Sequence, residues 1–153
     1  MLFANSNIDT REEFERRKAE AKKVADADGV AFAAVKYDHA DWLERVAKGF
    51  EGEPEKGARC ERCFRYSLEK SAEYAAEHGI DDFTTSLTVS PHKVSATVFA
   101  AGRAAEGASS GQARFLPVDF KKGDGFLLST RRTKELGLYR QSYCGCEFSR
   151  RGD

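Results

Sequence analysis

The stretch "VAFAAVKY", residues 30–37, decides the fold class. It is a continuous apolar run of strand length, which is typical of a sheet covered on both faces. Before it, residues 9–28 predict an amphipathic helix, because Asp9 or Thr10 can cap its start and Gly29 can close its end. A buried strand directly after a helix indicates an α/β protein.

The rest of the chain continues this alternation of helices and strands. We expect a helix over 40–48, an exposed loop over 51–59 and a long helix from Cys60 to His78. A strand over 83–87 follows, and then a helix over 92–103 with Ser90 as N-cap and Pro91 at its first position. The last elements are a strand over 114–120 and a helix over 125–137. Strands joined through helices form crossover units and parallel sheets. We therefore predict one α/β domain over residues 1–153, with a Rossmann-like or HUP-like, mainly parallel sheet and helices on both of its faces.

The beginning of the chain departs from this plan. Only Leu2 and Phe3 stand before the first helix as strand-like residues. A doubly wound sheet normally opens with a full strand, whose following loop contributes to the site. We therefore expect that the first strand is missing and that residues exist upstream of Met1.

Composition limits the classes of function. Charged residues make up 33% of the chain, and 25 basic side chains balance 25 acidic ones, so we expect a soluble globular protein without broad nonspecific affinity for nucleic acid. No apolar run reaches the roughly 18 to 20 residues that span a bilayer, and the start lacks the features of a signal peptide. We expect a cytoplasmic protein that does not bind membranes.

Basic residues gather near the C-terminal cysteines. They are Arg131, Arg132, Lys134, Arg140, Arg150 and Arg151. A phosphate-bearing partner near Cys144 is one interpretation, and an ordinary charged surface is the other.

The chain has four cysteines, in two tight pairs. Cys60 and Cys63 form a C-x-x-C motif at a helix start, where the helix dipole stabilises thiolate. This geometry suits zinc, an iron–sulfur cluster or a redox dithiol, and the alternative is two half-buried thiols that meet by chance. In the cytosol, clustered cysteines are more often metal ligands or redox catalysts than structural disulfides.

The second pair has a different spacing. Cys144 and Cys146 point to the same side of an extended segment, so they can bind one metal or close a small disulfide ring for which Gly145 provides backbone freedom. Strain makes such a ring easy to reduce. The positions of Cys63 and Cys144 differ by 81, far more than in a compact zinc ribbon. A zinc ion bound by both pairs stays an alternative, but an iron–sulfur site with a separate redox pair explains both spacings more naturally.

Five blocks of the sequence, in this order, resemble the QueH-type epoxyqueuosine reductases. They are "NSNI", "EPEKGARCERCF", "DFTTSLTVSPHK", "DFKK" and "TKELGLYRQSYCGCEFS". The resemblance extends from about Asn5 to Ser149. It implies reduction of the epoxide of epoxyqueuosine to queuosine at the tRNA wobble position. It also implies a [4Fe–4S] cluster with Cys60 and Cys63 among its ligands, a redox-active disulfide between Cys144 and Cys146, and an electron donor of unknown identity.

The chain departs from the family in one respect. Members begin with a strand and a Cys-Cys loop that supplies further cluster ligands, and this sequence has neither. We expect an upstream start; the alternatives are an inactive truncated paralogue and recruitment of Cys144 and Cys146 as replacement ligands. A zinc-stabilised, non-catalytic RNA-binding module and a thioredoxin-like dithiol exchanger are the rival functions.

Four other residues are candidates for substrate binding. Lys93, after Pro91, can face phosphate, and Tyr139 and Arg140 can contact anticodon bases. Asp119 can serve as a proton donor or metal ligand. For each of them the alternative is an ordinary surface, packing or capping role.

Overall fold

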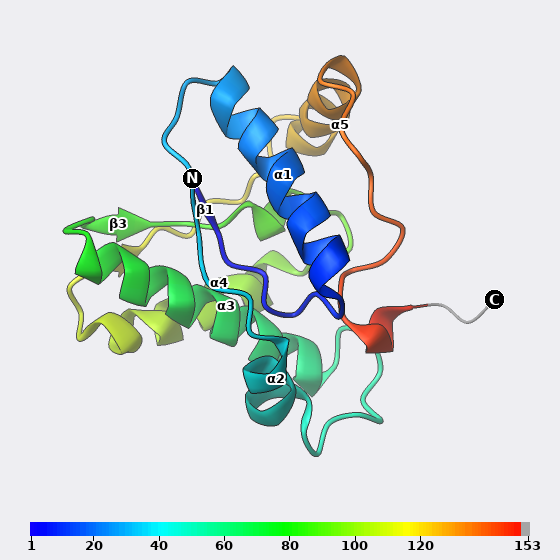
Figure 1. The fold of residues 1–153 in the computed structure, drawn as a ribbon. Helices are drawn as coiled ribbons and strands as arrows, with labels where there is room; N and C mark the ends of the chain where they lie inside the picture. Colours follow the sequence, from blue (N-terminus) through cyan, green and yellow to red (C-terminus); the bar gives the residue numbers. More distant parts are fainter. Residues whose placement is uncertain (151–153) are drawn as a thin grey trace.

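The computed structural model describes residues 1–150, in which helices surround two short pairs of parallel strands (Figure 1). Strand β1 (Leu2–Phe3) pairs with β2 (Ala33–Ala34), and β3 (Asp82–Phe83) pairs with β4 (Arg114–Phe115). The predicted α/β class and the parallel pairing are confirmed. The sheet is much smaller than predicted, because each pair is only two residues long and the two pairs do not join.

The α-helices are α1 (Arg11–Ala27), α2 (His39–Trp42), α3 (Ala58–Glu77), α4 (Ser95–Ala105) and α5 (Gly125–Glu135). A π-helical turn (Leu43–Ala47) extends α2, and 3₁₀ turns cover Ser86–Val89, Glu106–Ser109 and Glu147–Ser149. No helix in the described chain has the length and apolar character needed to cross a membrane.

The two ends of α1 confirm the capping predictions, and a glycine closes α3 in the same way. The Thr10 hydroxyl accepts a hydrogen bond from the Glu13 amide at 3.2 Å, which satisfies one of the free amides of the first turn. Gly29 and Gly79 follow the two helices with φ of +64° and +63°, the left-handed conformation that closes a helix.

The prediction of a doubly buried strand over 30–37 was wrong. Only Ala33–Ala34 forms a strand, and none of the eight residues is fully buried. Within residues 1–150, β2 has only β1 as a strand neighbour, and Val30 is 46% exposed. An apolar run of this length therefore indicates a preference for strand conformation here and does not show that the strand is buried.

The predicted start of the 92–103 helix was also wrong, because α4 begins at Ser95. The Ser90 hydroxyl accepts a hydrogen bond from the His92 amide at 3.3 Å, so Ser90 caps a turn and not the helix. The strands predicted over 83–87 and 114–120 are likewise shorter, since each gives way after Phe83 or Phe115 to a turn or an extended segment.

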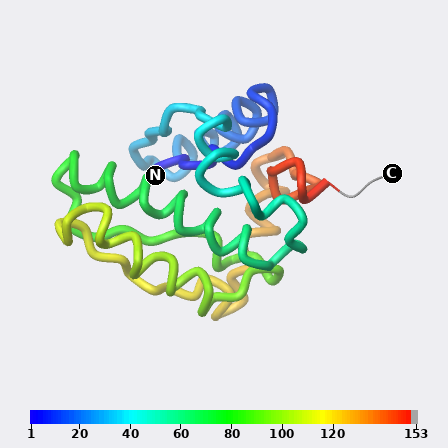
Figure 2. Tube along the Cα trace, turned by 90° about the horizontal axis from the view of Figure 1, so that it is seen from below, coloured from blue at the N-terminus to red at the C-terminus, as the bar shows by residue number. Residues whose placement is uncertain are grey.

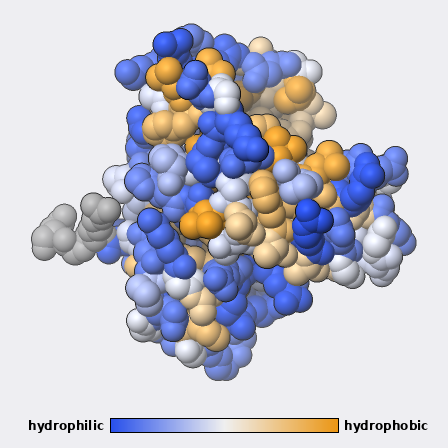
Figure 3. All heavy atoms as spheres, turned by 180° about the vertical axis from the view of Figure 1, so that it is seen from behind, coloured by the Kyte–Doolittle hydropathy of each residue, from blue (hydrophilic) through white to orange (hydrophobic). Residues whose placement is uncertain are grey.

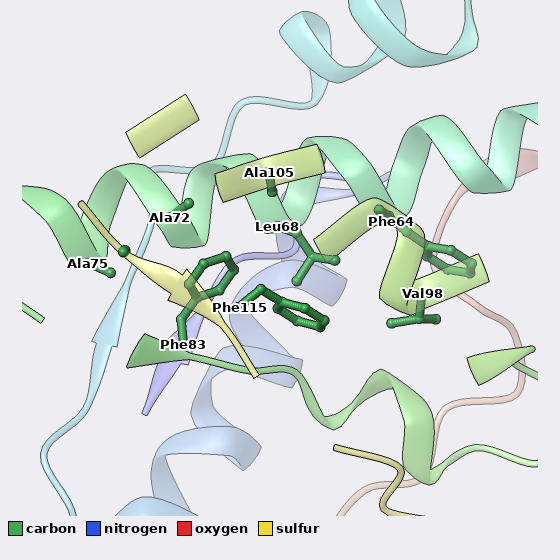
Figure 4. Close-up of a cluster of buried hydrophobic side chains, with 10 residues drawn as sticks. Phe64, Leu68, Ala72, Ala75, Phe83, Val98, Ala105 and Phe115 are labelled. Carbon is green, nitrogen blue, oxygen red and sulfur yellow. The ribbon is translucent and has the colours of Figure 1, made fainter. Parts of the chain in front are cut away.

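The main core lies between α3, α4 and the β3–β4 pair (Figure 4). Leu68 and Val98 are almost completely buried there, and the rings of Phe83 and Phe115 lie 5.4 Å apart. A Cβ added at Gly102 would lie 2.4 Å from the Phe115 ring, so the missing side chain lets α4 approach β4 closely.

The N-terminal segments lie on one side of α3, and α4 lies on the other (Figure 2). Apolar residues are also exposed among charged ones on the back of the molecule (Figure 3). A second, smaller core surrounds Trp42, which is fully buried, and includes Val46, Tyr66 and Cys146. This second core connects α2 and α3 to the C-terminal segment.

Candidate functional site

The structure brings all four cysteines to one pocket. Cys60 and Cys63 lie in the first turns of α3, and the C-terminal segment returns beside the start of α1 to add Cys144 and Cys146 (Figure 1). All four are free thiols. The pocket has a volume of about 360 Å³ including its open mouth, and its lining is Asn7, Trp42, Glu55, Arg59, Cys60, Cys63, Phe64, Lys93, Cys144, Cys146 and Ser149.

The loop that carries Cys144 and Cys146 is fixed to the N-terminal segment. The Asp9 amide donates to the Gly145 carbonyl at 3.0 Å, and Arg17 Nη1 donates to the Cys144 carbonyl at 2.9 Å. Gly145 has φ of +146°, and a Cβ there would lie 2.7 Å from the Asn7 amide nitrogen. Only glycine fits between the two thiols without displacing Asn7.

A histidine joins the same segments on the other side of the loop. His39 Nδ1 lies 2.9 Å from the Ser6 carbonyl, and Nε2 lies 3.2 Å from Glu147 Oε1. The imidazole also stacks on the Trp42 indole, with ring centres 5.3 Å apart. The wall of the pocket beside Cys146 is therefore held by hydrogen bonds and by aromatic packing.

Arg59, directly before the C-x-x-C motif, is a buried cation at the pocket. Its Nη1 donates to the carbonyls of Phe50, Glu51 and Glu53 at 2.8 to 3.0 Å, and the residue is 3% exposed. Arg59 forms no ion pair with a carboxylate of the described chain, and its Nε has no hydrogen-bond partner there. A buried cation of this kind favours negative charge nearby.

Burial dominates the electrostatics of two of the thiols. Burial raises the pKa of Cys63 to about 12, together with smaller contributions from the neighbouring Cys144, Cys146 and Cys60 and against a smaller lowering from Trp42. Burial also raises the pKa of Cys146, while Ser149 and Arg59 oppose that increase. Because both pKa values are raised, the Cys63 and Cys146 thiols stay protonated at neutral pH.

Lys93, one of the four candidates for substrate binding, lies between the pocket and solvent. Its Nζ is 3.2 Å from Cys144 Sγ and 5.3 Å from the centre of the Phe64 ring. Burial lowers the pKa of Lys93, but Cys144 and Cys60 outweigh this effect and raise it above its ordinary value. The ammonium group therefore places a positive charge directly beside a sulfur atom.

The other three predicted binding residues lie outside the pocket. Asp119 accepts a hydrogen bond from the Lys121 amide at 3.2 Å and pairs with the Lys121 ammonium at 3.4 Å. Tyr139 packs on α1. The Arg16 guanidinium lies 3.5 Å from the centre of the Tyr139 ring, and the Tyr139 amide donates to the Glu20 carboxylate at 2.9 Å. Arg140 is exposed. Their roles in substrate binding stay predictions.

The basic residues near the second cysteine pair are partly used in the fold. Arg132 pairs with Asp28 at 2.5 Å, and Arg150 pairs with Asp9 at 2.7 Å. Arg131, Lys134 and Arg140 are exposed, and Arg151 lies outside the described residues.

Sequence reasoning missed several residues of the pocket. Asn7, Trp42 and Arg59 line it, and none of them was singled out, although Asn7 and Arg59 stand in two of the sequence blocks that carry the resemblance. The available signals were the position of Arg59 beside Cys60 and the fact that Trp42 is the only tryptophan. The Trp42 indole nitrogen is buried and makes no hydrogen bond of ordinary geometry in the described chain, although it lowers the pKa of Cys63.

The four thiols are not gathered around one point. Within residues 1–150, no group of three or more His, Cys, Asp or Glu side chains is arranged to hold a single metal ion. The donor set at the pocket is therefore four sulfurs, spread over its wall and accompanied by two cations, Arg59 and Lys93.

Comparison with known proteins gives a consistent result. The family model described as epoxyqueuosine reductase QueH matches residues 1–152. Proteins named "Epoxyqueuosine reductase QueH" from Streptococcus pyogenes, Staphylococcus epidermidis and Thermotoga maritima are 38%, 36% and 34% identical to the chain, and each match covers 97% of it. The chain spans 60%, 65% and 77% of the lengths of these three relatives. With a family match over almost every residue and this level of identity, the chain belongs to the epoxyqueuosine reductase QueH family.

Proposed function

We propose that this chain reduces the epoxide of epoxyqueuosine to the alkene of queuosine in the wobble nucleotide of tRNA. The observation that carries the proposal is that two cysteine pairs, far apart in the sequence, line one pocket together with Lys93. The names of the relatives support the choice of substrate.

The pocket suits a [4Fe–4S] cluster as cofactor, with Cys60 and Cys63 as two of its ligands. Cysteine thiolates are the usual ligands of such clusters, which are larger than one ion and need their ligands further apart than a zinc ion does. Arg59 and Lys93 offset negative charge, and the indole N–H of Trp42 can donate to sulfur. When bound, the cluster would supply single electrons at low potential.

Cys144 and Cys146 have a separate role as a two-electron store. Both C–O bonds of the epoxide break, the carbon–carbon double bond forms, and oxygen leaves as water with two protons. The two thiols lose two electrons and two protons and form a disulfide, so the step balances. An external electron donor then reduces the disulfide to the dithiol.

Lys93 holds the reacting sulfur in place during this step. Its ammonium group lies 3.2 Å from Cys144 Sγ, where it can donate a hydrogen bond to that sulfur, at the boundary between the pocket and solvent. The burial of Trp42 and Phe64 beside the thiols limits access of bulk water to the same space.

The proposal is tested by anaerobic reconstitution of the chain, followed by iron and sulfide analysis and by conversion of tRNA that carries epoxyqueuosine. We expect iron and sulfide that bind through Cys60 and Cys63, and queuosine in nuclease digests. Cys60→Ser with Cys63→Ser should lose iron, whereas Cys144→Ser with Cys146→Ser should keep it and lose turnover. Ser142→Ala, an exposed change in the same segment, is the control.

The Streptococcus pyogenes relative serves as the positive control for substrate and reductant. If it converts the tRNA and this chain does not, the proposed activity is rejected. If Cys144→Ser retains full turnover, the role of the dithiol is rejected while the substrate stands.

A further inference from the structure

A second hollow adjoins the cysteine pocket. Its lining is Lys56, Cys60, Phe64, His92, Lys93, Val94 and Thr97, and its volume is about 280 Å³ including the open mouth. Cys60, Phe64 and Lys93 line both spaces, so the two are immediate neighbours. We call this second space the cationic hollow.

Among residues 1–150, the polar side chains at its rim include three basic groups and no carboxylate. Lys93 lies on the boundary with the cysteine pocket, while Lys56 and His92 lie on the outer rim and are exposed. Neither the Lys56 ammonium nor the His92 imidazole makes a hydrogen bond or an ion pair with any residue in 1–150. Lys121, by contrast, makes several such bonds. The hollow therefore presents basic donors that the fold itself does not use.

The backbone beneath these donors is anchored. The Lys56 amide donates to Cys60 Sγ at 3.2 Å, and the His92 amide donates to the Ser90 hydroxyl at 3.3 Å. Lys121 Nζ holds the Lys93 carbonyl at 3.2 Å. A ligand that binds here orders side chains only, because the loops that carry them are already fixed, and this lowers the entropy cost of binding.

Part of the lining of the hollow is apolar. Phe64 contributes a buried ring, and Val94 is 57% exposed. Apolar side chains next to basic ones fit a sugar with its phosphate, since the ribose packs on the apolar part while the phosphate oxygens face the donors.

We propose that the cationic hollow binds a backbone phosphate of RNA next to the nucleotide whose modified base enters the cysteine pocket. The inference rests on the proposed function. The chain has balanced charge, so affinity for RNA comes from local interactions of this kind and not from a general positive field. Lys56 and His92 bind the phosphate. Lys93, whose ammonium group lies beside Cys144, separates the bound phosphate from the cysteine pocket.

The test measures binding and not turnover. A fluorescent RNA stem-loop with a tRNA anticodon loop and guanine at the wobble position is titrated with the chain at salt concentrations from about 50 to about 200 mM. Lys56→Gln with His92→Gln should weaken binding roughly tenfold and reduce the salt slope by about 0.7 for each phosphate that the protein no longer neutralises. Lys36→Gln, which removes an exposed lysine outside both spaces, should leave affinity and slope unchanged.

A neutral methylphosphonate linkage beside the wobble nucleotide then locates the bound phosphate. At one of the two flanking linkages it should weaken binding of the unmodified chain and have no further effect on the double variant. The inference is overturned if the double variant keeps the original affinity and slope, or if the linkage weakens both proteins equally. If the unmodified chain does not bind the stem-loop at all, the proposed tRNA substrate is rejected as well.

Discussion

Arg17 and Cys144 are 127 positions apart in the sequence, and the guanidinium of Arg17 donates to the carbonyl of Cys144 at 2.9 Å. Arg17 also pairs with Glu13 at 2.7 Å and lies 4.9 Å from the centre of the Tyr143 ring. One helix side chain thus holds the backbone of the second cysteine pair, and so determines where that pair meets the first.

Removal of this guanidinium should therefore destabilise the fold. Arg17→Ala should lower the free energy of unfolding by about 2 to 3 kcal/mol, because a charged hydrogen bond is removed and Glu13 loses its ion-pair partner. Urea denaturation followed by circular dichroism measures the change. Arg103→Ala, at an exposed position of α4, should change stability by less than about 0.5 kcal/mol; equal effects for the two variants would contradict the role of Arg17.

Gly145→Ala should also destabilise the chain, for a steric reason. The φ of +146° is unfavourable for alanine, and the new Cβ would meet Asn7 at 2.7 Å and Ile8 at 3.3 Å. We expect a loss of about 2 kcal/mol, measured as a shift in the urea midpoint. Gly52→Ala is the matched control, since a Cβ there meets nothing within 4 Å; a shift no larger than that of the control would contradict the geometry.

Acid should loosen the attachment of the C-terminal segment to Asp9. Burial raises the pKa of Asp9, but hydrogen bonds from Arg150 and Tyr143 outweigh it and hold the pKa below its ordinary value. A lowered pKa gives stability that is fully present above about pH 4 and is lost as the pH falls through the folded-state value. Asp9→Asn should therefore lower the free energy of unfolding at pH 7. Below pH 4, that free energy should decrease less in the variant than in the unchanged protein.

Unfolding free energies at pH 3, 5 and 7 measure this dependence. Asp26→Asn, which removes one partner of an exposed ion pair with Lys22, should reproduce neither effect. An unchanged acid limb in Asp9→Asn would show that another carboxylate causes it.

In metal-free protein, Cys63 should be alkylated slowly. A pKa of about 12 leaves only about one part in ten thousand as thiolate at pH 8, against roughly a quarter for an ordinary thiol. Iodoacetamide labelling followed by peptide mass spectrometry should find Cys63 modified after Cys60. Labelling in urea is the control, because all four cysteines should then react at similar rates; early labelling of Cys63 in the folded protein would contradict its burial.

Local chemistry made some of the fold predictable. The ends of α1 and α3 depend on a capping hydroxyl and on glycines that adopt positive φ, and these signals lie within a few residues of the helix end. The start of α4 was mispredicted because the Ser90 hydroxyl has two local uses, a helix cap or a turn, and nearby residues do not distinguish them.

The sequence by itself determined the two cysteine pairs, their spacings and the family, since these depend only on the order of residues. Only the tertiary structure decided that the pairs meet, because the hydrogen bonds that bring them together, from Arg17 to Cys144 and from Asp9 to Gly145, join positions more than 120 residues apart. It also decided that Arg59 and Lys93 lie beside the thiols while Tyr139 lies on α1. Burial and charge at the pocket depend on these long-range interactions, and no local pattern encodes them.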